Sequence, residues 1–159
     1  MVRLASRVMS YLKSLLSSPR DGQENTAPET SITPFDPVDV ALGINELKSK
    51  VDMRIPQAKA RVFMPRAEES GRLALSTFCV DGLEEVDRWI LLDRHVKPLL
   101  ARVETRVQSF RDAGLTVDPD NDPERHVNVT GWPAEREACK LLAQESLCKM
   151  QRFILRAVP

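Results

Sequence analysis

The segment from Pro133 to the C-terminus constrains the fold most, because its pattern predicts one long amphipathic helix. Pro133 suits the first helical position, where its missing N–H removes no hydrogen bond. Apolar or small residues then recur at steps of three and four, which is the helical period. They are Cys139, Leu142, Ala143, Ser146, Leu147, Met150, Phe153, Ile154 and Ala157, and the opposite face carries Glu137, Lys140, Gln144, Glu145, Lys149, Arg152 and Arg156. Such a stripe is typical of a helix packed on a core rather than of a ligand pocket.

Shorter elements precede this helix. Strands are expected at residues 60–65 and 72–80, joined by a polar hairpin loop, and again at 125–130. A helix is expected over 81–98, with Asp81 and Glu84 forming a capping box at its start. Residues 39–53 carry a weak helical pattern, and 101–114 fit either a strand followed by a helix or one helix. The fold class predicted is α+β: one domain over residues 39–159, with a small antiparallel or mixed sheet packed by two or three helices.

The first 17 residues predict a basic amphipathic helix without an acidic residue. Its apolar face, the candidate interaction surface, consists of Leu4, Val8, Leu12 and Leu15. Two explanations fit this helix equally: a docking element for a protein or a peripheral membrane surface, or upstream sequence translated from a misassigned start. An organellar transit segment is the less favoured third explanation. Residues 18–38 are rich in Ser, Thr, Pro and acidic residues, which is the composition of a flexible linker.

The overall composition disfavours some classes of partner. The 23 basic and 23 acidic residues cancel, and only 5% of residues are aromatic, so a nucleic-acid partner is disfavoured unless a local basic patch forms. Three cysteines without a CxxC spacing indicate a reducing compartment, and we expect a cytoplasmic location. No apolar run reaches the ~20 residues of a transmembrane helix.

The stretch Asp118–Pro133, DPDNDPERHVNVTGWP, concentrates the unusual residues of the chain. Asp118, Asp120 and Asp122 have the alternating spacing of a calcium loop, but Pro123 stands where that loop needs glycine and Val129 where it needs glutamate. We therefore interpret residues 118–123 as an acidic turn exposed to water. No metal site is expected, because neither histidine belongs to a ligand pattern.

The strand that follows this turn carries the candidate catalytic residues. Val127 and Val129 point to one face, while His126, Asn128 and Thr130 point to the other. An exposed polar edge of a sheet explains this pattern. The functional alternative is an anion-binding strip in which Arg125 binds a phosphate or carboxylate, His126 acts as acid or base, and Asn128 orients the substrate.

A basic cluster at Arg54, Lys59, Arg61, Arg66 and Arg72 surrounds the first predicted strands. Its default interpretation is a solvated surface, partly neutralised by neighbouring acids. Four arginines are candidates for binding an anion: Arg54, Arg61, Arg66 and Arg125. The sequence contains no Gly-rich phosphate loop, no G-x-S-x-G turn and no kinase signature, so no cofactor is predicted.

Two segments resemble a family of small bacterial proteins of unassigned activity, characterised by an S-x-F-x-x-D-G-L turn and an RH-x-N-x-x-GWP segment. The resemblance covers roughly residues 58 to 145. The matching residues are Ser76, Phe78, Asp81, Gly82, Leu83, Trp89, Arg125, His126, Asn128, Gly131, Trp132 and Pro133. The resemblance implies a bacterial cytoplasmic origin, which weakens the transit-peptide explanation, and it brings no known catalytic residue.

Three functional hypotheses remain open at this point. The first is a non-enzymatic protein-interaction module, an accessory or regulatory subunit of a bacterial defence or toxin-related system, docked through its N-terminal helix. The second is an enzyme acting on a nucleotide or phosphorylated substrate through Arg125, His126 and Asn128. The third is a nucleic-acid adaptor that uses the cluster from Arg54 to Arg72.

Overall fold

The computed structural model describes residues 36–157, which contain all the predicted elements of the folded body. The predicted N-terminal helix, with Leu4, Val8, Leu12 and Leu15, lies outside the described residues. So does the predicted linker, except for its last three residues. None of the helices within residues 36–157 has the length and apolar character needed to cross a membrane.

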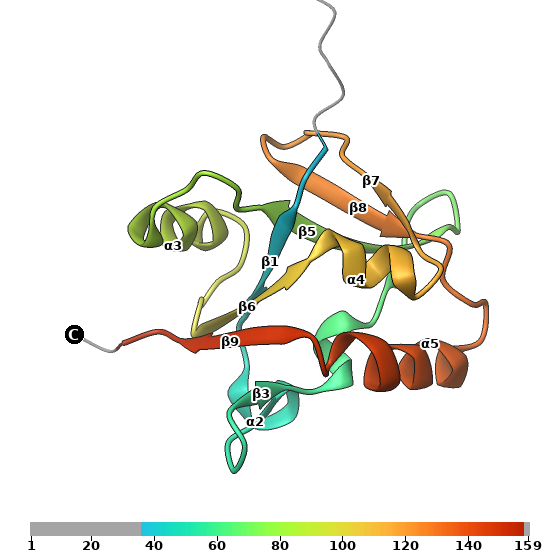
Figure 1. Ribbon diagram of the computed structural model, residues 1–159, viewed down its shortest axis with the longest axis horizontal. Helices are drawn as coiled ribbons and strands as arrows, with labels where there is room; N and C mark the ends of the chain where they lie inside the picture. Colours follow the sequence, from blue (N-terminus) through green and yellow to red (C-terminus); the bar gives the residue numbers. More distant parts are fainter. Residues whose placement is uncertain (1–35, 158–159) are drawn as a thin grey trace, which may run out of the picture. The chain divides into compact units, whose positions relative to one another are not determined.

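Short strands and short helices alternate along the chain (Figure 1). The strands are β1 (Asp39–Ile44), β2 (Val51–Asp52), β3 (Gln57–Ala58), β4 (Arg66–Ala67), β5 (Leu73–Cys79), β6 (Ala101–Arg106), β7 (Thr116–Asp118), β8 (His126–Thr130) and β9 (Gln151–Leu155). The helices are α2 (Leu47–Lys50), the 3₁₀ turn η1 (Ala60–Phe63), α3 (Glu85–Asp93), α4 (Val107–Asp112), α5 (Arg136–Leu142) and its π-helical continuation η2 (Ala143–Leu147).

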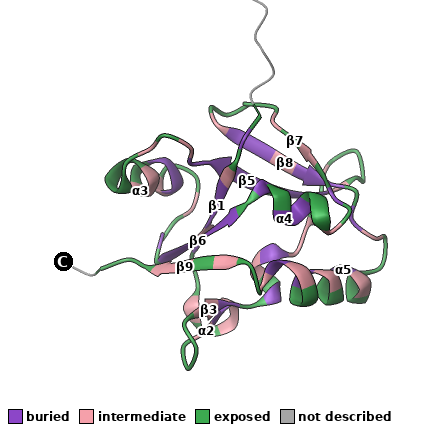
Figure 2. Ribbon diagram, viewed as in Figure 1, coloured by how far each residue is buried: buried purple, intermediate pink, exposed green. Residues whose placement is uncertain are grey.

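The main sheet has the strand order β7-β8-β5-β1-β6-β9, with β4 added beside the start of β5. Every strand pair in the described residues is antiparallel, so the predicted combination of helices with a small antiparallel sheet is confirmed. Residues of β1 alternate between two cores. Val40, Leu42 and Ile44 face α4, α5 and η2, whereas Ala41 faces α3. Figure 2 shows the resulting burial of the central strands.

The prediction of a long C-terminal helix is wrong, because the helix ends at Leu147 and Gln151–Leu155 forms β9. β9 pairs with β6 from Gln151↔Thr105 to Leu155↔Ala101. Without it, β6 would present a row of unpaired backbone groups. The Gln151 side chain also binds both the N–H and the C=O of Ala58, at 2.9 and 2.8 Å. The helical spacing of apolar residues continues through residues 153–157 in the sequence. The long-range bonds to β6 and Ala58 nevertheless hold this segment as a strand.

Two further segments differ from the sequence-based expectation. The weak helix over 39–53 is replaced mainly by the central strand β1, whose apolar run reflects burial on both faces. The strand expected at 60–65 is instead the 3₁₀ turn η1. In a 3₁₀ turn residues three apart lie on the same side, and Ala60 and Phe63 are both buried. The hairpin partner of β5 is therefore the two-residue strand β4.

The remaining predicted elements are present, with one changed cap. Residues 101–112 form a strand and then a helix, the first of the two alternatives. The helix expected over 81–98 is confirmed but covers only Glu85–Asp93. Asp81 does not cap it: the carboxylate accepts hydrogen bonds from the N–H groups of Val38 and Asp39, at 2.7 and 2.8 Å, and so secures the start of β1.

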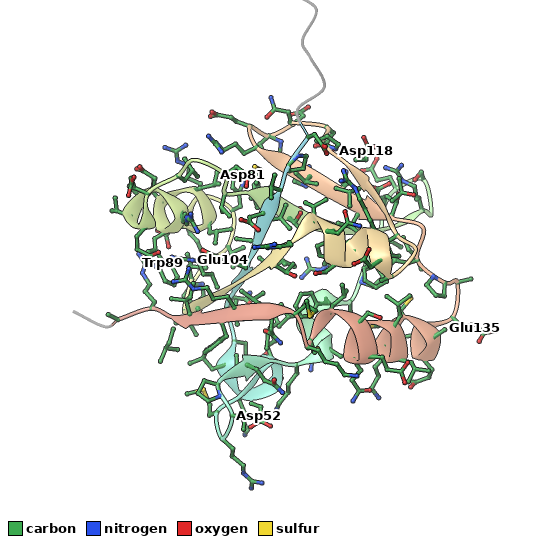
Figure 3. The ribbon with its side chains drawn as sticks, in the orientation of Figure 1. Asp52, Asp81, Trp89, Glu104, Asp118 and Glu135 are labelled. Carbon is green, nitrogen blue, oxygen red and sulfur yellow. The ribbon has the colours of Figure 1, made fainter. Side chains whose placement is uncertain are left out.

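A charged network fixes α3 over the sheet. Arg102 on β6 is fully buried and donates to Glu104 at 2.8 Å and to Glu85 on α3. Its guanidinium lies 4.3 Å from the centre of the Trp89 ring, a cation–π contact. Figure 3 shows Trp89 and Glu104 between α3 and the sheet. α3 is thereby held over one part of the sheet face and leaves the neighbouring part, on β5 and β8, uncovered.

Candidate functional site

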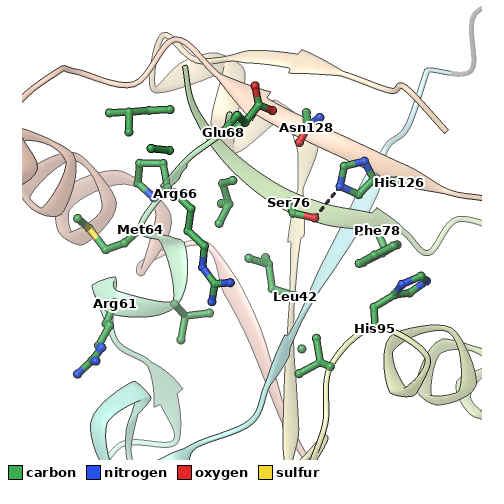
Figure 4. Close-up of a pocket in the computed structure, with 18 of the residues that line it drawn as sticks. Leu42, Arg61, Met64, Arg66, Glu68, Ser76, Phe78, His95, His126 and Asn128 are labelled. Carbon is green, nitrogen blue, oxygen red and sulfur yellow. Dashed lines mark hydrogen bonds between the residues drawn. The ribbon is translucent and has the colours of Figure 1, made fainter. Parts of the chain in front are cut away.

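A pocket of about 1150 Å³ opens where β1 and β5 separate. These strands pair only through Val40↔Cys79 and Ala41↔Phe78, and β4 then takes the place of β1 beside β5. The pocket lies over the face of β5 and β8 that carries Ser76 and extends through the gap beside β5 to Arg136 and Cys139 on α5. It is also bordered by residues 61–68, by the turn after α3 and by the loop between β7 and β8 (Figure 4).

The register of β5 and β8 brings a serine and a histidine together in this pocket. Ser76 lies opposite Asn128, and Phe78 lies opposite His126. Directly opposed residues share one face of a sheet, and diagonal neighbours are within reach of long side chains. His126 is the diagonal neighbour of Ser76, so its ring extends back along the face toward the serine.

The three side chains of Ser76, His126 and Asp120 form a continuous hydrogen-bonded relay. His126 Nε2 lies 2.6 Å from Ser76 Oγ, and His126 Nδ1 lies 2.6 Å from Asp120 Oδ1. The histidine side chain is only 11% exposed and the aspartate 34%, whereas Ser76 is exposed to the pocket. With the proton on Nδ1, the ring donates to Asp120 and accepts the serine O–H at Nε2.

The loop between β7 and β8 is folded so that Asp120 returns to the sheet. Asn121 and Arg125 adopt left-handed backbone conformations, with φ of 55° and 66°, and asparagine tolerates that region well. Asn121 Oδ1 accepts a bond from Arg125 N at 2.7 Å, and Asn121 N donates to His126 O at 3.1 Å. Besides His126, Asp120 Oδ1 accepts a bond from Asp122 N at 3.3 Å, and Asp120 Oδ2 accepts one from Asn128 Nδ2 at 2.8 Å. The carboxylate is therefore held by donors on both oxygens.

Phe78 and His95 form the wall of the pocket beside this relay. The two rings are stacked with centroids 4.4 Å apart, and Phe78 meets the His126 ring edge-on at 5.5 Å. Burial lowers the pKa of His95 below its usual 6.5, and the neighbouring His126 and Arg94 act in the same direction. His95, which the sequence placed late in a helix, lies in the turn after α3 and reaches the pocket.

The backbone of Ser76 faces the gap between the separated strands. N–H groups of successive strand residues point to alternate sides. Cys79 N donates toward β8 and Val80 N toward β1, so the Ser76 N–H points to the side where β1 has diverged. β1 pairs with β5 only as far as Ala41↔Phe78, so its ladder does not reach Ser76.

The structure brings only some of the predicted site residues together. His126 and Asn128 line the pocket, as do Arg61 and Arg66. Arg125 does not: its guanidinium donates to Asp81 O at 3.0 Å and lies at the ends of β5 and β8. The other outlying candidate is Arg54, which is exposed between β2 and β3 and likewise does not line the pocket.

Two interpretations of the surrounding chain change. β8 lies between β7 and β5 rather than at an edge, and His126 and Thr130 are buried. The acidic turn is not merely solvated, because Asp120 binds His126. Sequence reasoning missed Ser76 and Asp120 as site residues. Ser76 shares its strand face with Ala74 and Phe78, so no polar pattern singled it out, and Asp120 gave no signal beyond its proximity to His126 in sequence.

Trp132 is buried in the core beneath α5 and donates to Val129 O at 2.9 Å. Among residues 36–157 no group of three or more His, Cys, Asp or Glu side chains is arranged to hold a metal ion.

No protein-family model matches this chain, and no curated protein or solved structure matches it either. The resemblance to the small bacterial family stays a prediction.

Proposed function

We propose that this protein is a hydrolase that cleaves ester bonds, with Ser76 as the nucleophile, His126 as the general base and Asp120 as the group that orients the histidine. The observation that carries the proposal is the unbroken relay from Oγ through both ring nitrogens to a carboxylate, with each contact at 2.6 Å. A nucleophile bonded to a base, and a base bonded to an orienting carboxylate, are the geometric criteria for activating serine.

In the first half of the reaction Ser76 Oγ attacks the carbonyl carbon of the ester and transfers its proton to His126 Nε2. The developing imidazolium is stabilised by Asp120, and the Ser76 N–H, on the side where β1 has diverged, would donate to the carbonyl oxygen as it gains negative charge. His126 then gives the proton to the departing alkoxide. The products of this half are a free alcohol and an acyl group on Ser76.

In the second half water replaces the alcohol. His126 Nε2 takes a proton from the water as its oxygen attacks the acyl carbon, and the carboxylic acid leaves when the proton returns to Ser76 Oγ. The pocket supports this step because Ser76 is exposed to it, so both substrate and water reach the hydroxyl. Phe78 packs against the ring of His126 and keeps it in place.

The test is labelling with a fluorophosphonate probe, which phosphonylates activated serines, followed by peptide mass spectrometry. We expect the modification on Ser76 in the wild-type protein, and its loss in Ser76→Ala and His126→Gln. Ser70 is a matched control, since it is an exposed serine in the loop before β5 with no histidine beside it. Ser70→Ala should label like wild type.

Hydrolysis of 4-nitrophenyl butyrate gives the second readout. His126→Gln should lower kcat/KM by at least about 10³-fold, the scale seen when members of such relays are removed. Circular dichroism must show that each variant is folded. If folded wild-type protein labels Ser76 no more than Ser70, the proposal fails. The non-enzymatic interaction hypothesis, which depends on residues 1–17, would then be preferred.

A further inference from the structure

Four basic side chains line the same pocket as the serine relay. They are Lys50, Arg61, Arg66 and Arg136. In the described part of the chain none of the four has a carboxylate within 4 Å. Four carboxylates line the pocket as well: Glu68 binds Arg72 at 2.8 Å, Asp120 binds His126 at 2.6 Å, and the other two are Glu46 and Asp122. Glu46 is near enough to Lys50 to raise its pKa, but it forms no ion pair with it. The four cations therefore lie in the pocket without a direct ion pair.

The effect of these charges on one another is visible in Lys50. Burial lowers the pKa of Lys50 below its usual 10.5, and the positive charges of Arg66 and Arg61 lower it further, against the smaller opposite effect of Glu46. Mutually repelling cations that converge on one cavity are stabilised when an anion enters between them.

Arg66 connects this basic end to the catalytic relay. It lies on β4 opposite Ala74, and Ala74 is two residues before Ser76 on β5. Residues two apart on a strand share a face and lie about 7 Å apart, so Arg66 and Ser76 belong to the same face. Figure 4 shows the Arg66 side chain extending into the pocket beside Leu42.

The basic surface continues beyond the pocket. Arg61 and Arg136 also border a neighbouring hollow of about 600 Å³, which Lys59 and Lys140 line as well. Among the ion pairs within residues 36–157, Lys140 is the one of these four with an acidic partner, Glu137 at 3.6 Å on the same helix. A carboxylate carries a single charge, whereas a phosphate or diphosphate carries two or more and offers several acceptor oxygens to arginines. The several basic side chains of the site therefore match a phosphate or diphosphate better than a carboxylate.

We propose that the substrate ester carries a phosphate group, and that Arg66, with Lys50, Arg61 and Arg136, binds this phosphate while the acyl carbon lies at Ser76. This inference rests on the proposed hydrolase, and it adds the substrate class: acyl esters of phosphorylated compounds. The sequence cluster from Arg54 to Arg72 is thereby divided, with Arg61 and Arg66 in the binding site and Arg54 outside it.

Binding is tested without catalysis, by titrating the full-length protein with pyrophosphate in a calorimeter. We expect saturable binding that persists in Ser76→Ala and weakens by about 10-fold or more in Arg66→Gln, the loss of one charge-assisted bond. Arg54→Gln is the matched control and should bind like wild type. Equal weakening in Arg66→Gln and Arg54→Gln, or no pyrophosphate binding, would overturn the phosphate site. So would tighter binding of a single-stranded oligonucleotide, which would indicate a nucleic-acid surface instead.

Kinetics then separate the two proposals. We would compare the 4-nitrophenyl esters of butyric acid, succinic acid and 3-phosphonopropionic acid. The first ester is neutral, the second carries a carboxylate and the third carries a phosphonate group. The phosphonylated ester should have the highest kcat/KM, and Arg66→Gln should reduce its ratio to the neutral ester by about 10-fold or more. A preference for the succinate ester would overturn the phosphate assignment and leave the hydrolase intact. Pyrophosphate binding without hydrolysis of any ester would overturn the hydrolase and leave the anion site.

Discussion

Replacing Asp120 by asparagine tests the contact that orients the histidine of the relay. Both carboxylate oxygens of Asp120 accept hydrogen bonds, Oδ1 from His126 Nδ1 at 2.6 Å and Oδ2 from Asn128 Nδ2 at 2.8 Å. The amide of Asp120→Asn has only one acceptor oxygen. Its NH₂ group must therefore face either Asn128, whose amide must then turn over so that its oxygen accepts, or His126, where it forces the proton from Nδ1 to Nε2 and removes the base from Ser76.

The size of the effect follows from the charge that is lost. An imidazolium and a carboxylate with centres about 4 Å apart attract each other by about 4 kcal/mol at an effective dielectric constant near 20. The Asp120 side chain is 34% exposed, so water screens part of this attraction. A remaining 3 kcal/mol or so corresponds to on the order of a hundredfold in kcat/KM, and the wrong tautomer of His126 adds to that.

Steady-state hydrolysis of 4-nitrophenyl butyrate by Asp120→Asn, Asn128→Asp and the double variant measures this. In the double variant the amide NH₂ introduced at position 120 has an acceptor in the carboxylate introduced at position 128, so the amide oxygen is free to accept from His126 Nδ1. We expect kcat/KM to fall by about 10²–10⁴ in Asp120→Asn and to recover by about 10-fold or more in the double variant. Folded Asp120→Asn protein with activity within about threefold of wild type, or a double variant as inactive as the single one, would refute the reasoning.

Three other predictions concern the packing around the site. Gly43→Ala should lower the free energy of unfolding in urea by about 1–3 kcal/mol, because a Cβ there would lie 2.8–2.9 Å from Val96 and Leu99; unchanged stability would contradict that packing. The pKa of His95 is lowered on folding, so protonation disfavours the native state; the wild type should lose more stability than His95→Phe as pH falls below about 6.5, and parallel losses would be inconsistent with it. Burial raises the pKa of Cys148 from 9.0 to about 11, so iodoacetamide near neutral pH should alkylate it roughly a hundredfold more slowly in native than in unfolded protein, as peptide mass spectrometry would measure.

The sequence predicted correctly those elements in which the spacing of apolar residues matches the side chains that are buried in the fold. In β8 the valines face a core and the polar residues face the pocket side, so strict alternation identified the strand. β5 was identified by its mixture of β-branched and aromatic residues, and the helix expected over 81–98 by its helical spacing. The predicted segment 101–114 ends at Gly114, which has a φ of 78° just after α4, a conformation that favours glycine.

Elements fixed by distant partners were not predictable in this way. Gln151–Leu155 continues a helical pattern in sequence, but its conformation is decided by β6, which lies 46 to 54 residues earlier in the paired register. β1 is central and apolar on both sides, so it shows no alternation that separates a strand from a helix. The functional role of Ser76 depends on the pairing of β5 with β8, which brings residues fifty positions apart into contact.

The conformation of the loop between β7 and β8 indicates that the relay does more than supply hydrogen bonds to a buried histidine. Antiparallel neighbours such as β7 and β8 need only about two connecting residues, yet residues 119–125 intervene and place Asn121 and Arg125 in left-handed conformations. An arginine in that region is strained by about 1 kcal/mol. This longer, strained connection brings the Asp120 carboxylate back to the His126 ring. Ser76 is exposed to the pocket, where water could supply its hydrogen bonds, so burial does not require the serine to bind the histidine. Backbone strain that holds a carboxylate behind a histidine, and a histidine behind an exposed hydroxyl, is the arrangement that positioning a nucleophile requires.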